Sequence, residues 1–187
     1  MNPLSLFSEN RHMRAHYSDI QALSHLQDRL ANYLITAGGR KVILLCIGTD
    51  RSTGDSLGPL TGTKLSQKCL PGLVILGTLE KPIHAENLAS TMDEIKATYH
   101  NPYIIALDAC LGRLDSVGHI TLTEGPLKPG TAVKKELPEV GDIHLTGIVN
   151  INGFMQYMVL QNTRLNTVWQ MADTLCHLFC KIYLKTV

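Results

Sequence analysis

Apolar and polar positions along the first 110 residues predict strands and helices in turn. Continuous apolar runs rich in β-branched residues are typical of strands buried on both faces. Such runs predict strands at 41–47, 73–79 and 103–108. Apolar residues at helical spacing predict helices at 18–38, 58–70 and 85–99, the first with Ser18 as its N-cap. This order is typical of a parallel sheet with helices on both faces.

The pattern changes after residue 108. Residues 118–123 alternate between apolar and polar, and Pro and Gly punctuate the stretch that follows. We predict two short strands here, at 118–123 and 131–136, one of them antiparallel. A short helix is expected over 153–160, and apolar positions from Val168 to Ile182 predict a long amphipathic helix at the end of the chain. The sheet therefore has five predicted strands and is mostly parallel.

Length and composition are typical of one folded domain. The chain has 187 residues, of which 44% are hydrophobic, and this is enough for a substantial core. We expect a single α/β domain over 1–187, with residues 1–16 as a flexible or loosely packed arm. The sequence contains no run of about 20 apolar residues and no signal-peptide core near its start. We therefore expect a cytoplasmic protein with no membrane partner.

Charge and cysteine usage exclude two further classes. The formal net charge is +1, and the basic residues are scattered along the chain, so we expect no nucleic-acid partner. Five cysteines without a CxxC pair argue against a disulfide framework and against a zinc knuckle. An oligomeric assembly is left open.

Two aspartates follow predicted strands at the same edge of the predicted sheet. Asp55 lies in the glycine-rich loop after the first strand, and Asp108 ends the apolar strand 103–108. Ligands of open parallel sheets bind beyond the carboxyl ends of the strands. Two carboxylates in one cleft can divide into an acid and a base, or can share a divalent metal ion. Taken singly, either aspartate could instead bind loop amides or cap a helix.

A histidine and several loop residues join this candidate site. Of the eight histidines, we expect His144 to be the one best placed to reach the cleft, although a lone histidine is more often structural. The candidate substrate-binding residues share the loop with Asp55. They are Thr49, Asp50, Arg51 and Ser56.

A second interpretation depends on the motif Gly-Asp-Ser-Leu-Gly at 54–58, which matches both a nucleophile elbow and the signature of the GDSL serine esterases. In that interpretation Ser56 is an acyl-transfer nucleophile. An elbow serine, however, follows its strand directly, whereas here about seven residues intervene. The DxxH pair of those esterases is also missing, since Asp173 and His177 are one residue too far apart.

The order of these motifs resembles the hydrogenase maturation protease and germination protease superfamily. Gly48-Thr49, five spacer residues, Asp55, Ser56-Leu57-Gly58-Pro59, then Leu107-Asp108-Ala109 and finally His144 follow one another as in that superfamily. Over nearly its whole length the chain is similar to the YyaC-type sporulation proteins of spore-forming bacteria. The most specific segments are Thr-Gly-Asp-Ser-Leu-Gly-Pro and Val-Asn-x-x-Gly-Phe-Met.

This resemblance implies a three-layer αβα sandwich and a peptidase that acts on a protein or peptide during sporulation, in the cytoplasm or spore compartment. It also implies catalytic roles for Asp55 and Asp108, or a divalent metal ion held by Asp55, Asp108 and His144. One alternative is a catalytically silent protein that keeps the protease fold and binds a partner. The other is the serine esterase.

Overall fold

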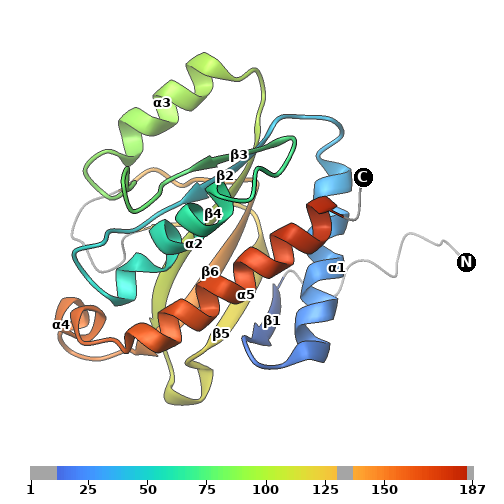
Figure 1. The fold of residues 1–187 in the computed structure, drawn as a ribbon. Helices are drawn as coiled ribbons and strands as arrows, with labels where there is room; N and C mark the ends of the chain where they lie inside the picture. The colour runs from blue at the N-terminus through green and yellow to red at the C-terminus, as the bar shows by residue number, and fades with distance from the viewer. Residues whose placement is uncertain (1–11, 130–136, 185–187) are drawn as a thin grey trace, which may run out of the picture.

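Six strands form one mixed sheet in the part of the chain that the computed structural model describes, residues 12–129 and 137–184. Their order across the sheet is β1-β5-β6-β4-β2-β3 (Figure 1). The strands are β1 (His12–His16), β2 (Val42–Cys46), β3 (Leu73–Leu76), β4 (Tyr103–Gly112), β5 (His119–Glu124) and β6 (Ile143–Ile151). Strands β2, β3, β4 and β6 pair in parallel, and β5 runs antiparallel between β6 and β1.

Helices lie on both faces of this sheet and complete a three-layer αβα arrangement (Figure 1). They are α1 (Ile20–Thr36), α2 (Leu57–Ser66), α3 (Leu88–Thr98), α4 (Gln156–Gln161) and α5 (Leu165–Leu184), with two single 3₁₀ turns, η2 (Gly54–Ser56) and η3 (Leu114–Ser116). Helices α1, α2 and α5 share one core with the sheet, and α3 shares the other. No helix in the described ranges is long and apolar enough to cross a membrane.

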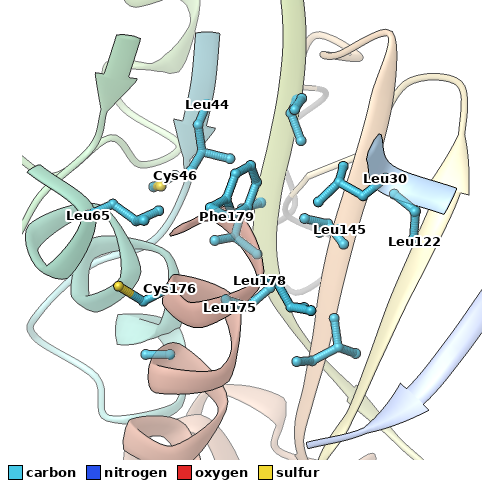
Figure 2. Close-up of a cluster of buried hydrophobic side chains, with 14 of the residues drawn as sticks. Leu30, Leu44, Cys46, Leu65, Leu122, Leu145, Leu175, Cys176, Leu178 and Phe179 are labelled. Atoms are coloured by element: carbon cyan, nitrogen blue, oxygen red, sulfur yellow. The ribbon is translucent and has the colours of Figure 1, made fainter. Parts of the chain in front are cut away.

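The larger core lies between the sheet and helices α1, α2 and α5. Phe179 on α5 is fully buried there and points toward the strands among Leu44, Leu145 and Leu178 (Figure 2). On the opposite face, α3 packs its buried side chains on the other side of β2 and β4. Both faces of these two strands are therefore covered, as their continuous apolar sequences predict.

The α/β class, the helices on both faces and the single strand that runs against the others confirm the predicted fold, but the number of strands was wrong. The missed strand β6 covers a stretch interpreted from the sequence as a polar segment before a helix. Ile143, Leu145 and Val149 are buried on one face, and polar residues alternate with them. This period of two is the signal of a strand with two different faces. The predicted strand at 131–136 lies outside the described residues.

The expected N-terminal arm is also wrong for its last five residues, because His12–His16 forms strand β1. Ala15 is buried, and the strand pairs with β5 over its whole length. Three of its five residues are His or Arg, so the sequence carries no hydrophobic strand signal. Main-chain hydrogen bonds to β5 supply the stabilisation instead.

Smaller differences concern where elements begin and end. Asp19, rather than Ser18, caps α1, since its carboxylate accepts a hydrogen bond from the Ala22 amide at 3.0 Å. Strand β4 continues to Gly112, so Asp108 lies within the strand and not at its end. The continuation pairs with β6 through a register shift between Cys110 and Leu111.

Two glycines fix the turn from β2 into α2. Gly48 has a φ of +141°, and a Cβ atom there would lie 2.0 Å from the carbonyl oxygen of Asp55. A Cβ atom on Gly58 would lie 2.1 Å from the carbonyl oxygen of Ile47. Only glycine permits such close approach of two main-chain segments. The start of α2 is therefore held directly against the end of β2, with Asp55 just before the helix.

Candidate functional site

A pocket of about 510 Å³ opens at the carboxyl ends of β2 and β4. Ligands of open α/β sheets bind at such an edge. Its walls come from the loop after β2, the segment before α3, the second half of β4 and the region of α4. The polar residues that line it include Thr49, Arg51, Ser52, Asp55, His84, Asp108, Thr146, Asn152, Gln156 and Tyr157.

Both predicted aspartates line this pocket. Asp55 lies in η2, and its own carbonyl oxygen accepts a hydrogen bond from the Thr49 amide at 3.1 Å, which closes the loop. Asp108 points from β4, and its Oδ1 accepts a hydrogen bond from the amide of Ala109 at 2.8 Å. The two acids come from separate segments that the β2–β4 pairing holds side by side.

The two carboxyl groups influence each other electrostatically. Burial and the negative charge of Asp55 raise the pKa of Asp108 to about 8, and the Ala109 amide opposes this only in part. Burial also raises the pKa of Asp55, whereas the nearby His84 acts in the opposite direction. At neutral pH the pair therefore holds a proton, and Asp108 is the carboxyl that retains it.

His84 is a site residue that the sequence analysis missed. It lines the pocket beside Asp55. The main chain places it there, because Ile83 extends the sheet beside Ile47 and accepts a hydrogen bond from the Gly48 amide at 2.8 Å. Asn87 then fixes the turn by accepting from the His84 amide at 2.8 Å. The only available signal was a histidine soon after a predicted strand.

His144 is not brought into the pocket, contrary to the prediction. It lies early in β6, opposite Ala106, whereas Thr146 is the residue opposite Asp108. Its Nδ1 is hydrogen-bonded to the carbonyl oxygen of Gly125 at 2.8 Å. The prediction failed because β6 was not recognised as a strand. Within that strand the His144–Ala106 pair lies two residue pairs before the Thr146–Asp108 pair.

The four predicted substrate-binding residues divide into two groups. Thr49 and Arg51 line the pocket, and the Thr49 hydroxyl accepts a hydrogen bond from the Arg51 amide at 3.3 Å. Asp50 is exposed on the loop and Ser56 is buried, and neither is among the pocket-lining residues. Of the four predicted residues, Thr49 and Arg51 are therefore the two that can contact a ligand in the pocket.

Two potential nucleophiles nearby are unsuited to the role. Ser56 is only 6% exposed, and its hydroxyl donates to the carbonyl oxygen of Thr53 at 2.7 Å. Cys110 lines the pocket, but burial and the charge of Asp108 raise its pKa to about 11. Its thiol therefore stays protonated at neutral pH and is a poor nucleophile.

The predicted three-residue metal site does not form. Within the described ranges, no three His, Cys, Asp or Glu side chains converge so as to hold a metal ion. Asp55 and Asp108 offer two carboxylates, but the third predicted ligand, His144, is bound elsewhere. The donor set thus does not fit the metal that the resemblance implied, and the chemistry of the site follows from the carboxyl groups.

The fold is an α/β architecture similar to that of a hydrogenase maturation protease. The NiFe hydrogenase maturation protease HycI from Thermococcus kodakarensis KOD1 has a similar structure, with a TM-score of 0.54, and the match covers 86% of this chain and 99% of that one. The sequence identity is 16%, so this likeness shows the fold alone.

The chain belongs to the family described as "Protein of unknown function (DUF1256)", whose model matches residues 14–178. It is 51% identical over 172 residues to the "Uncharacterized protein YyaC" of Bacillus subtilis (strain 168), covering 91% of this chain and 84% of that protein. The resemblance to YyaC-type proteins with a protease fold is thereby confirmed.

Proposed function

We propose that this protein is a peptidase that uses Asp55 and Asp108 as a paired acid and base. One observation carries the proposal: two partly buried carboxyl groups from different segments share one pocket, and their environments favour a single proton between them. Titratable pairs whose environments separate their roles are typical of acid–base sites. The pocket of about 510 Å³ has room for a short stretch of a peptide.

Each acid has a distinct task. Asp108 keeps its proton at neutral pH, so its carboxyl O–H can donate a hydrogen bond to the carbonyl oxygen of the scissile amide. Burial raises the pKa of Asp55, and His84 beside it acts in the opposite direction and favours the ionised carboxylate. Ionised Asp55 can accept a proton from a water molecule held between the two acids.

The reaction then follows from these positions. The water oxygen attacks the amide carbon as Asp55 takes its proton, and the Asp108 proton stabilises the charge that develops on the carbonyl oxygen. When the C–N bond breaks, Asp55 returns the proton to the leaving nitrogen. One water is consumed, a carboxyl group and an amine are formed, and both side chains end in their starting states.

The substrate class follows from the same site and the resemblance. We place Thr49 and Arg51, both on the pocket wall, against main-chain carbonyl groups of a protein substrate. The role in sporulation belongs to the proposal as well. Deletion of the gene in a spore-forming host should alter spore yield or germination if this role is correct.

The direct test compares cleavage by the wild-type protein with that by Asp55→Asn and Asp108→Asn. Each is incubated with the proteome of the host cell, and new protein N-termini are labelled and counted by mass spectrometry. We expect cleavage products from the wild type, and none above background from either variant. Equal products from wild type and variants would show that the aspartates do not catalyse.

A catalytically silent binding protein would give a different result. Wild type would then produce no new N-termini, but an immobilised sample would still retain a specific partner. The variants also separate chemistry from folding, because the Asn side chain has nearly the size of Asp and leaves an acceptor for the Ala109 amide.

A further inference from the structure

We propose that an apolar lip beside the pocket docks an extended, uncharged apolar segment of a protein chain. The apolar lip consists of Ile151, Phe154, Met155, Tyr157 and Met158. All five side chains are exposed, and Phe154 is fully exposed. Clustered exposed apolar side chains mark interaction surfaces in soluble proteins. This inference rests on the proposed function, because the segment is taken to run outward from the pocket that holds Asp55 and Asp108.

The lip is continuous with the candidate active site. Its Tyr157 lines the pocket that holds Asp55 and Asp108. Ile151, Met155 and Met158 line a second, open hollow between the end of β6 and α4. A peptide that leaves the pocket toward α4 would therefore cross the lip.

Contacts within the fold hold the lip in a fixed position. Asn150 holds α4 in place, since its amide nitrogen donates to the Val159 carbonyl at 3.3 Å and to the Thr163 hydroxyl at 3.2 Å. Gly54, which begins η2, has no room for a side chain, because a Cβ atom would lie 2.8 Å from both Leu160 and Thr163. The turn that carries Asp55 thus rests directly on α4, and the lip is fixed relative to the acid.

The charge and the size of the lip indicate which kind of ligand it binds. No Asp, Glu, Lys or Arg occurs between Asp142 and Arg164, so the lip itself carries no ionic partner for a charged chain, and the charged residues Arg51, Glu86 and Lys128 line the adjoining pocket instead. Methionine side chains adapt to varied apolar groups. A stable dimer needs roughly 20–30 residues on each side, many more than this short segment supplies, and we therefore commit to a substrate segment over a second copy of the chain.

The test measures the binding of a peptide rather than its cleavage. The probe is a fluorescein-labelled peptide of 15 residues with Phe, Leu and Val at its centre and Gly, Ser and Lys around them. A second peptide has Ser in place of the three apolar residues. Dissociation constants are measured by fluorescence anisotropy for the wild type, the double variant Phe154→Ser/Met158→Ser, and Asp108→Asn.

We expect the apolar peptide to bind the lip variant at least about tenfold more weakly than the wild type, because two apolar contacts are lost. The Ser-substituted peptide should bind all proteins weakly. The control variant Ile20→Ser/Ile35→Ser removes two exposed apolar residues from α1 and should bind like the wild type. Circular dichroism checks that each variant is folded.

Two results would overturn the inference. One is equal binding of the apolar peptide to the wild type and the lip variant. The other is a wild-type dimer in sedimentation velocity that the lip variant abolishes while peptide binding is unchanged, which would make the lip a contact between copies. Asp108→Asn separates the proposals: if it binds like the wild type while no protein is cleaved by the wild type, the lip stands and the peptidase does not.

Discussion

Asp108→Asn should make the protein more stable as the pH rises, relative to the wild type. The pKa of Asp108 is raised from an ordinary value of 3.8 to about 8 in the folded protein. The folded state therefore holds a proton that the unfolded chain has released over the range between these values. Wild-type stability is lost as the pH rises through this range, and Asn, which has no proton to release, removes that loss.

The magnitude follows from the same pKa. One proton taken up on folding changes the free energy of unfolding by about 1.4 kcal/mol per pH unit. Between pH 5 and pH 7 the Asp108 contribution to wild-type stability should fall by about 2.7 kcal/mol. Since natural domains have only about 5–15 kcal/mol of stability in total, this difference is large enough to measure.

The assay is urea unfolding of both proteins at several pH values between 5 and 7, followed by circular dichroism and by the fluorescence of Trp169, the single tryptophan. A chelator is present throughout. The relevant quantity is the difference between variant and wild type, because titrating groups that do not interact with Asp108 cancel. Asp93→Asn, an exposed position on α3, serves as the matched control and should follow the wild-type pH dependence.

A change in that difference below about 1 kcal/mol from pH 5 to pH 7 would refute the reasoning. It would correspond to an Asp108 pKa below about 6, and the carboxyl would then be ionised at neutral pH. The division of tasks between Asp108 and Asp55 would lose its basis. The pocket and the placement of the two acids would be unaffected.

Three further expectations concern the neighbours of the aspartates. Gly58→Ala should lower the free energy of unfolding by roughly 3 kcal/mol in urea unfolding, because its Cβ would meet the Ile47 main chain; Gly153→Ala, with ordinary space around it, should change little. His84→Gln should move the acidic limb of the kcat/KM pH profile to higher pH, because a group that lowers the Asp55 pKa is lost; an unmoved limb would remove His84 from the site. Ser56→Ala should retain peptidase activity, and the wild type should not react with a fluorophosphonate probe; labelling of Ser56 would revive the esterase.

The sequence was sufficient for the acids because their placement depends on local pattern. Asp55 follows a strand that is recognisable from its apolar run, and Asp108 lies in another such run. Parallel strands place their carboxyl ends at one edge, so the pairing of the two acids could be expected. The extension of β4 beyond Asp108 could not, because it depends on pairing with the unrecognised strand β6.

The two histidines show where local pattern fails. His84 reaches the site only because Ile83 pairs with Ile47, a contact between residues 36 positions apart that no local period encodes. The prediction for His144 is wrong for a related reason. The polar residues around it are typical of a loop, but they belong to strand β6, which pairs with β4 and β5. Contacts distant in sequence decide both positions, and composition and spacing say little about them.

The two glycines that join β2 to α2 have a consequence for how the site meets a substrate. At Gly48 and Gly58, main chain rests on main chain with no side chain between them. Such a contact has no rotamers to rearrange, so the main chain that carries Asp55 is held in position by the fold itself. In the proposed mechanism, a base held in this way needs no ordering when the transition state forms, and the binding energy of the substrate is left to position the scissile bond.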